Sequence, residues 1–404
     1  MVMNKKVNQF FIAISTGILF LAPLVASAAT SASFEVSGWI PYWRTATGTA
    51  DVLPHLNELT EVNPFVYSLK SDGTLLDNGK LDQEPWKSFI ATAKQKKVRV
   101  IPTIMTSNSD LLHTLLSKSK SRIALEQTIA TLVEQNNFDG IDIDFEGKKA
   151  ADRDYFSTFL KGLYSRMGKK WVMCTIESRT PLADRYDGTT PPPDATVYAN
   201  DLAAINKYCD RVRIMAYDQQ TVDQKLSNEA ASSSQLYAPI ADPAWVEKVV
   251  NLMAKSIKKN KITIGVPTYG YEYDVTAYAG TQYMYDILWT FNPKYALDIA
   301  AQYGITPSRN AQGEMYFTYV TASTSTTPAE LGANSAQLAA VAATTYATAY
   351  NSHLDFRLME WSDAESLAEK IALAKRLGVR GVSIFKLDGG EDPNTWAVLS
   401  GVKK

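Results

Sequence analysis

The chain has 404 residues, of which 46% are hydrophobic and 11% aromatic, enough for one large domain with an insertion or for two or three smaller ones. Its formal net charge of −1 argues against a nucleic-acid-binding surface. The three histidines lie in no metal-ligand or Ser-His-Asp pattern, and two cysteines are too few for a disulfide scaffold. Cys174 and Cys209 suit either one bridge in a secreted protein or two buried thiols.

Residues 1–28 predict a secretory signal peptide. Two lysines precede an apolar run over residues 10–25, and the run ends in the small residues Ala-Ser-Ala, with cleavage expected after Ala28. The run is short for a membrane span, although an uncleaved anchor is the alternative. We therefore expect a secreted protein without a stable membrane anchor after cleavage. It would be extracellular or associated with the cell wall, or periplasmic if the source is Gram-negative.

Eight short β-rich runs recur along the mature chain, with helical patterns between them. The candidate strands cover residues 34–43, 61–69, 97–106, 137–146, 170–178, 210–218, 261–270 and 378–387. Segments with apolar residues at helical spacing cover 84–96, 121–135, 154–167, 243–259 and 363–377. Eight strand-helix units predict an α/β fold, a (β/α)8 TIM barrel within 29–404. A doubly wound open sheet is the alternative, but no glycine-rich phosphate loop follows the first strand.

The spacing breaks once, because roughly a hundred residues separate the seventh run from the eighth. We expect an inserted α+β subdomain there, over residues 272–358, with possible strands at 314–320 and 355–361. The Ala-, Ser- and Thr-rich stretch 321–350 suits either a surface loop or a modest helix.

Four acidic side chains fall within FDGIDIDFEG, residues 138–147. In a strand, Asp142, Asp144 and Glu146 share one face and apolar residues the other. Barrel strands are covered on both faces, so these acids are expected to point into the barrel near the end where active sites lie. Close buried carboxylates raise at least one pKa, as a general acid requires. Asp139 lies off this parity and is expected to be structural.

Two alternatives apply to this segment. A sheet strand showing its acids to solvent is the simpler one, but the barrel context turns that face inward. An EF-hand calcium loop also begins with acids at its first, third and fifth positions and Gly at its sixth. Counted from Asp142 the sixth residue is Gly147, but the twelfth is Arg153, where a Glu is needed. We therefore expect no metal and no cofactor.

The acids spell DxxDxDxE from Asp139 to Glu146, and this pattern resembles the signature of glycoside hydrolase family 18, the chitinase family. The sixth run ends in MAYD, residues 215–218, which is similar to the family's MxYD motif. The first and seventh runs, GWIPYW and KITIGVPTYGYEYD, resemble its opening and penultimate strands. The likeness covers nearly all of the mature chain, including an insertion before the last strand.

The resemblance implies a retaining glycosidase acting on β-linked N-acetylglucosamine glycans such as chitin or peptidoglycan, without a protein nucleophile. Glu146 would protonate the glycosidic oxygen and later activate water, while the substrate's own acetamide oxygen attacks the anomeric carbon. Asp144 would orient the acetamide, and Asp142 would hold a shared proton and tune Asp144. Tyr217 would donate a hydrogen bond to the acetamide oxygen.

The same resemblance implies a set of substrate-binding residues. They are Met215, Asp218, Trp39, Tyr42, Tyr269 and Phe385. Packing and strand-end capping are the alternatives for several of them. Phe385 stands where many relatives have Trp, so we expect a smaller or displaced sugar-stacking floor.

The segments MEWSDAESLAEKI (359–371) and LDGGEDPNTW (387–396) are more similar to bacterial relatives that act on cell-wall glycans than to typical secreted chitinases. The expected partner is therefore an N-acetylated polysaccharide or oligosaccharide. A catalytically silent, lectin-like glycan-binding protein on the same fold is the alternative function. Because the chain keeps Glu146 and its neighbouring acids, the enzyme is favoured.

Overall fold

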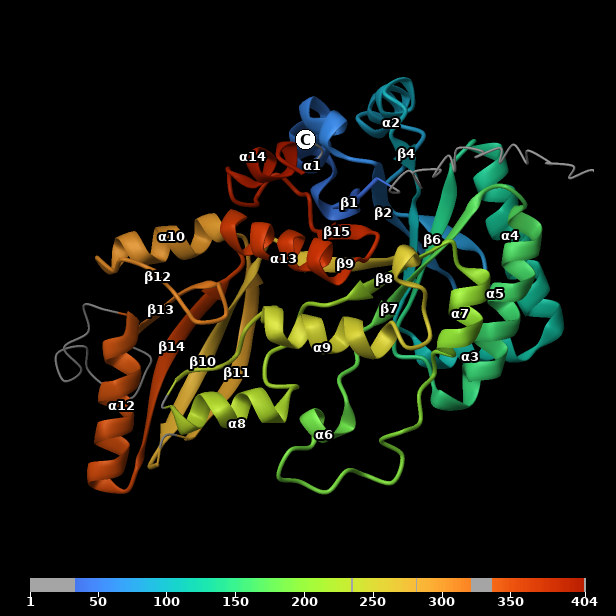
Figure 1. Cartoon of the computed structure of the whole chain (residues 1–404). Helices are drawn as coiled ribbons and strands as arrows, with labels where there is room; N and C mark the ends of the chain where they lie inside the picture. The colour runs from blue at the N-terminus through green and yellow to red at the C-terminus, as the bar shows by residue number, and fades with distance from the viewer. Residues whose placement is uncertain (1–32, 234, 281, 321–335, 403–404) are drawn as a thin grey trace, which may run out of the picture. The chain divides into compact units, whose positions relative to one another are not determined.

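Eight parallel strands close into a barrel in the computed structural model, which describes residues 33–233, 235–280, 282–320 and 336–402 (Figure 1). Around the barrel the order is β1, β2, β5, β6, β7, β8, β9 and β15, and β15 pairs again with β1. The barrel strands are β1 (Glu35–Pro41), β2 (Glu61–Leu69), β5 (Thr103–Thr106), β6 (Gly140–Phe145), β7 (Trp171–Glu177), β8 (Arg211–Met215), β9 (Ile262–Pro267) and β15 (Gly381–Phe385). Each predicted run contains one of these strands, and the predicted TIM barrel is confirmed.

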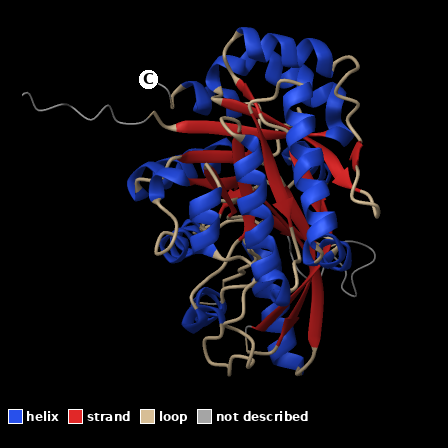
Figure 2. Cartoon of the chain, turned by 90° about the vertical axis from the view of Figure 1, so that its right-hand side faces the viewer, coloured by secondary structure: helices blue, strands red, loops and turns tan. Residues whose placement is uncertain are grey.

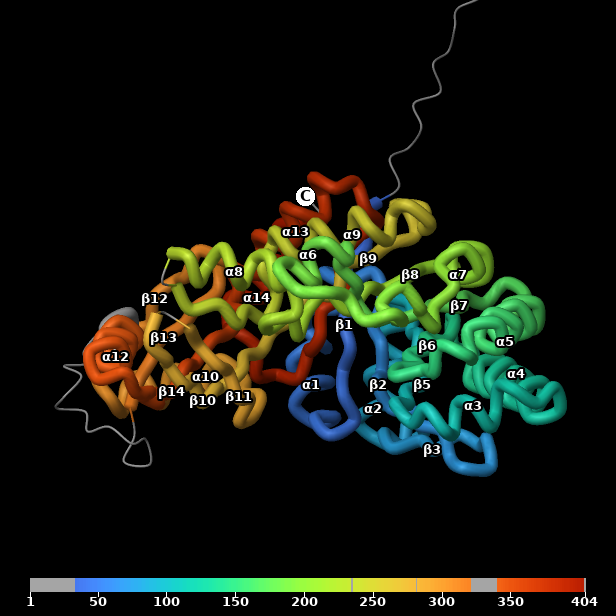
Figure 3. Tube along the Cα trace, turned by 90° about the horizontal axis from the view of Figure 1, so that it is seen from below, coloured from blue at the N-terminus to red at the C-terminus, as the bar shows by residue number. Residues whose placement is uncertain are grey.

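Helices connect consecutive barrel strands and cover the outside of the barrel; Figure 3 shows several of them outside β5 to β8. The helices between barrel strands are α1 (Thr45–Val52), α2 (Trp86–Gln95), α3 (Ser109–Ser117), α4 (Ser119–Gln135), α5 (Arg153–Met167), α6 (Leu182–Arg185), α7 (Leu202–Tyr208), α8 (Gln224–Ser232), α9 (Pro243–Met253) and α13 (Ala364–Leu377), and α14 (Thr395–Ser400) follows the last strand, β15. Helix α13 shows why the bounds fall where they do. The side chain of Asp363 caps its first turn by accepting from Ser366 N, and Gly378 ends it with a φ of 68°.

The third strand differs from the prediction of one run over 97–106. It is split into β4 (Arg99–Val100) and β5, and only β5 continues to the next barrel strand. Pro102 lies at the break, and a proline has no N–H to donate to a neighbouring strand. A short strand, β3 (Leu75–Asp77), pairs antiparallel with the end of β2 and was not predicted.

Strand β6 explains the amphipathic pattern of FDGIDIDFEG. Its apolar side chains point outward, where the ring of Phe145 packs on Phe156 and Phe159 of α5 at centroid distances of 6.3 Å and 5.6 Å. Its acids point into the barrel. Asp139, just before the strand, accepts a hydrogen bond from Val100 N at 2.8 Å, which fits the structural role expected for it.

The insertion between β9 and α13 is a five-stranded antiparallel sheet with helices (Figures 1 and 2). It contains β10 (Gly270–Tyr278), β11 (Gln282–Phe291), α10 (Pro293–Gln302), β12 (Ser308–Arg309), β13 (Met315–Tyr319), α12 (Ala336–Tyr350) and β14 (His353–Trp361). It extends past both ends of the predicted range 272–358, because Gly270 on β10 pairs with Trp361 on β14. Helix α12 occupies the second half of the stretch 321–350, whose first half lies outside the described residues.

The predicted signal peptide, 1–28, also lies outside the described residues. In the part of the chain that the structure describes, no helix combines the length and the apolar character needed to cross a membrane.

Candidate active site

Strand β6 carries the row of inward acids. Asp142 is fully buried, Asp144 is 3% exposed, and Glu146, one residue past the strand end, is half-buried. The backbone N–H of Glu146 donates to the carbonyl oxygen of Thr106 on β5 at 2.9 Å. The row therefore runs from the barrel interior to the carboxyl end of the strands, where active sites of such barrels lie.

Four side chains from four other strands donate hydrogen bonds to Asp142. Its Oδ2 accepts from Trp39 Nε1 at 3.1 Å, Thr103 Oγ1 at 2.8 Å and Arg213 Nη1 at 2.8 Å, and its Oδ1 accepts from Thr175 Oγ1 at 2.8 Å. A carboxyl group surrounded by donors acts as an acceptor on both oxygens, as an ionised carboxylate does. Asp142 is therefore held in place by four side chains at the lower end of the row.

Asp144 lies one step nearer the mouth of the barrel. Among the described residues, its buried Oδ1 has no hydrogen-bond partner. Burial, followed by the charges of Glu146 and Asp142, raises the pKa of Asp144 well above its ordinary value, and the cation of Lys148 only partly opposes this. Asp144 is therefore the group that holds a proton inside the row.

Glu146 combines a raised pKa with access to the mouth of the barrel. Burial is the largest cause of the raised pKa of Glu146, and the charge of Glu177 is the second. A half-buried carboxyl group at the carboxyl end of a barrel strand that keeps its proton to higher pH is suited to general acid catalysis.

Lys148 and Glu177 form an ion pair beside Glu146 that the sequence did not predict. Lys148 Nζ lies 3.6 Å from Glu177 Oε2 and also donates to the carbonyl oxygen of Phe145. Glu177 Oε1 accepts from Gly147 N at 3.0 Å, directly after Glu146, where the backbone has a φ of 60° that favours glycine. Although burial opposes its charge, Lys148 and these hydrogen bonds lower the pKa of Glu177. The pair therefore fixes the turn that carries the predicted acid.

The segment after β8 brings Tyr217 and Asp218 beside the row. The ring of Tyr217 stacks on Phe385 with centroids 5.6 Å apart. Burial, and then the charge of Asp144, raises the pKa of Tyr217 well above its ordinary value, so its hydroxyl stays a neutral donor. Asp218 Oδ1 accepts from the hydroxyls of Tyr269 and, at 2.7 Å, of Tyr271.

Met215, also predicted to bind substrate, is half-buried at the end of β8 and packs against the barrel core. Its place leaves the packing alternative open.

Two aromatic residues lie differently from the prediction. Trp39 is only 1% exposed, and its indole donates to Asp142 and Thr103 beneath the row instead of lining a sugar-binding surface. Tyr42 is exposed and makes an edge contact with Trp43, and it is Trp43 that reaches the cavity at the mouth of the barrel. The depth of each ring in the barrel could not be predicted from the pattern of β1 alone.

A cavity of about 440 Å³ opens at this end of the barrel. Phe385, Tyr269 and Asp218 line it from the barrel side, and Tyr271 and Phe291 line it from the insertion. The insertion therefore builds one wall of the cleft beside the acid row.

The cations of this site were missed in the sequence, although one signal for them was present. In VRIM, residues 212–215, Arg213 has the same parity as Met215 and Tyr217, so the alternation that turns Asp142 inward also turns Arg213 inward. Lys148 and Glu177 lie at strand ends, where alternation gives no direction. Only the folded geometry shows that they meet.

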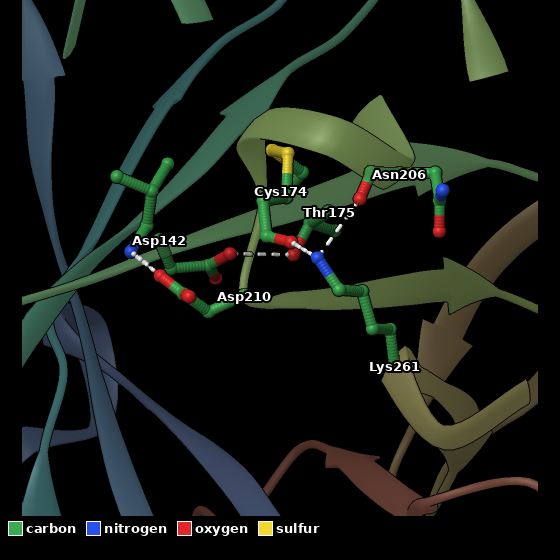
Figure 4. Close-up of a disulfide and its surroundings, with 8 residues drawn as sticks. Asp142, Cys174, Thr175, Asn206, Asp210 and Lys261 are labelled. Carbon is green, nitrogen blue, oxygen red and sulfur yellow. Dashed lines mark hydrogen bonds between the residues drawn. A yellow bond between two sulfur atoms is a disulfide. The ribbon is translucent and has the colours of Figure 1, made fainter. Parts of the chain in front are cut away.

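A disulfide lies behind the site. Cys174 on β7 is bonded to Cys209, with their Cα atoms 6.0 Å apart. Figure 4 shows that the next residue, Thr175, points the opposite way and donates to Asp142. Of the two states that the sequence left open for the cysteines, the structure shows the bridge, and it ties the strand that supplies one donor of the row to the segment before β8.

This combination of fold and inward acids matches a known family. The model described as "Glycosyl hydrolases family 18" matches residues 36–390. The chain belongs to glycoside hydrolase family 18. The predicted family is thus confirmed, and with it a relationship to glycosidases.

Family 18 relatives from bacteria are among the similar proteins. The "Uncharacterized glycosylase YvbX" of Bacillus subtilis is 25% identical over 227 residues, 54% of this chain and 61% of YvbX. The spore cortex-lytic enzyme SleL of Bacillus megaterium has the same fold with a TM-score of 0.66 at 18% identity, covering 93% of this chain and 76% of SleL. A class V chitinase of Pseudomonas fluorescens has a TM-score of 0.67 at 20% identity, covering 92% of this chain and all of the chitinase (100%).

Proposed function

We propose that this protein is a retaining glycoside hydrolase that cleaves β-linked N-acetylglucosamine glycans with the help of the substrate's acetamide. The observation that carries the proposal is the acid row itself. Glu146, half-buried at the carboxyl end of β6, has a raised pKa and follows Asp144 in the row, which is buried with a raised pKa and an unpartnered oxygen among the described residues. A silent binding protein needs neither proton.

In the first step, Glu146 gives its proton to the glycosidic oxygen as the bond from that oxygen to the anomeric carbon breaks. The acetamide carbonyl oxygen forms a bond to the same carbon, and a positively charged oxazolinium ring results. Asp144 orients the acetamide N–H, and the neutral Tyr217 hydroxyl donates to the acetamide oxygen. Holding the internal nucleophile in place removes orientational entropy from the barrier.

In the second step, the Glu146 carboxylate accepts a proton from water as the water oxygen attacks the anomeric carbon. The bond to the acetamide oxygen breaks, the oxazolinium charge is neutralised, and Glu146 is again protonated. Two inversions at one carbon give net retention, so the product should have the β configuration of the substrate.

Among N-acetylated glycans, one observation favours peptidoglycan over chitin. Arg44 and Lys386 line the cleft on the side of Asp388, which both contact, with Arg44 Nε 3.5 Å from its Oδ2, while Asp218 lines it from the barrel side. These two cations can pair with the carboxylates of a glycan such as peptidoglycan, which bears them in its lactyl and peptide groups, whereas chitin has none. The glycosylase and cortex-lytic relatives support the same choice.

We also propose that the protein is exported. The signal-like sequence over residues 1–28 and the Cys174–Cys209 bridge both fit an oxidising compartment outside the cytoplasm.

Product analysis tests the proposal. The purified protein is incubated separately with chitin oligosaccharides and with peptidoglycan, and the products are identified by mass spectrometry and their first-released anomer by NMR. Hydrolysis with the β anomer released first supports the proposal. An α anomer would contradict acetamide participation, and binding without hydrolysis of either glycan would favour the lectin-like alternative.

A further inference from the structure

Arg213 lies at the lower end of the acid row and is fully buried. One guanidinium nitrogen, Nη1, donates to Asp142, and the other, Nη2, donates to Glu61 on β2. The guanidinium carbon also lies 4.8 Å from the centre of the Trp39 ring. A planar guanidinium can bridge two carboxylates in this way, whereas the single ammonium of a lysine cannot match both.

The charges around this point come from several strands. Asp142 is approached by the cation of Arg213 from β8 and by the neutral donors of β1, β5 and β7, with Asp144 above it on β6. Arg213 faces two anions, Asp142 and Glu61, and the sulfur of Met173 at 3.6 Å. Glu61 has a second cation, Arg99 of β4, with Nε at 3.6 Å.

A buried ionic arrangement of this kind is not explained by stability. Apolar side chains of similar volume usually fill a barrel interior at no loss, because charges taken out of water carry a large desolvation cost. Here the guanidinium is aimed at the acid directly beneath the proton-holding Asp144. Its position therefore points to control of where protons reside in the row.

We propose that Arg213 is a positioning residue that keeps Asp142 an acceptor, so that the resting proton of the row stays on Asp144. The inference rests on the proposed function and goes beyond it. It assigns the resting proton to Asp144 alone, whereas the family resemblance implies a proton shared between Asp142 and Asp144. In the resting site Asp142 accepts the hydrogen bonds of Arg213 and the other donors, and the protons of the row lie on the residues above it. No bond to carbon is involved, and the only thing assigned is the location of one proton.

The acidic limb of the pH profile of kcat/KM tests this assignment. In Arg213→Gln the cation beneath the row is gone, so the row should bind an additional proton at higher pH and the acidic limb should move upward by about one pH unit or more. Arg213→Lys restores a positive charge and should return most of that displacement. Each variant is checked for folding by circular dichroism and thermal unfolding at the pH of the assay.

Two matched variants separate charge from packing. Glu61→Gln removes the competing anion, so the cation acts on Asp142 more strongly and the limb should move to lower pH, opposite to Arg213→Gln. Thr175→Val removes one neutral donor to Asp142 and should move the limb upward by less than Arg213→Gln does. Both variants keep Arg213, so they remain informative if Arg213→Gln does not fold.

Two results would overturn the inference about Arg213. An acidic limb that stays in place in Arg213→Gln while activity falls equally at every pH would show a merely structural role and overturn the inference. An upward movement of the acidic limb in Glu61→Gln would also overturn it. If the unchanged protein hydrolyses neither glycan, the proposed function fails first, and the proton assignment falls with it.

Discussion

Two buried carboxyl clusters in this chain behave differently. The first is the acid row of β6, at the mouth of the barrel. The second joins the insertion to the barrel, where the carboxyl groups of Glu314 and Glu360 share a hydrogen bond and both pKa values are raised, in each case mainly by burial. By burial and pKa alone, the two clusters would be judged alike.

Their hydrogen bonds separate them. Glu314 accepts from Ile240 N and Ala241 N, each at 2.9 Å, and lies 3.7 Å from the ammonium of Lys370. Both of its oxygens are thus occupied inside the protein. In the acid row, Asp144 keeps a buried oxygen that meets no donor among the described residues, and Glu146 is only half-buried at the carboxyl end of the barrel. A raised pKa therefore points to proton transfer where the carboxyl group can pass its proton to a bound molecule. It points to a structural role where both carboxyl oxygens are bonded within the protein.

The largest expected effect that sharpens this comparison is on turnover. In Glu146→Gln the acid is lost while the shape is kept, so we expect kcat to fall about 10²- to 10⁴-fold with oligosaccharide affinity retained. Steady-state kinetics and calorimetric binding measure the two quantities. Turnover close to that of the unchanged protein would remove Glu146 from the mechanism.

Asp144→Asn should lose turnover on the order of 10²-fold and yet gain stability. The pKa of Asp144 is raised in the folded protein, so its folded state binds more protons than the unfolded state and stability falls as pH rises above the unfolded value. The amide carries no such cost. We expect unfolding free energy at pH 7 to rise by about 1 kcal/mol. A Tm that is lower than that of the unchanged protein at pH 7 would contradict this.

Glu314→Gln should show the reverse pattern, with stability lowered by about 1–3 kcal/mol and kcat nearly unchanged. One acceptor for the two backbone donors becomes an NH2 group, and Lys370 loses its counter-ion. Glu360→Gln is the matched control, because its amide can still donate to Glu314. Denaturant unfolding at pH 7 compares the two. Equal losses of unfolding free energy in both variants would contradict the prediction, because they would show that Glu314 and Glu360 do not differ as acceptor and donor.

The smallest expected effect concerns the cleft beside the acid row. Trp43→Ala should raise KM about fivefold with kcat unchanged, since losing one aromatic contact costs about 1 kcal/mol. Tyr42→Ala, which removes the neighbouring ring outside the cavity, should change KM less. A larger effect of Tyr42→Ala would restore it to the substrate-binding role predicted from the sequence.

Much of the barrel and of the acid row could be predicted because both follow from local alternation. Strand β6 shows its acids on one face in any register, and eight strand-helix units close in one common way. The partners of the row could not be predicted in the same way. Whether Trp39 lies beneath Asp142 or at the cleft depends on how far each strand is shifted along its neighbours. That shift is set by the closed barrel, not by any one segment.

The cations Arg213 and Lys148 were missed for the same reason, because a local pattern does not show which side chains meet across the barrel. Parity places Arg213 inside the barrel, but it does not say that Arg213 reaches the same layer as Asp142 on a strand two positions away. Lys148 and Glu177 are brought together by turns, and no periodic pattern describes a turn. The split of the third strand at Pro102, in contrast, was readable, because a proline interrupts strand pairing wherever it lies.

The pairing of Gly270 with Trp361 has a consequence for the history and engineering of the chain. The insertion leaves the barrel and returns to it at adjacent points, so to the barrel it is equivalent to a short turn between β9 and α13. A module with neighbouring ends can be gained, lost or exchanged in one genetic event without rethreading the strands. Grafting a different module at this point would replace one wall of the cleft and leave the barrel strands, with the acid row, unchanged.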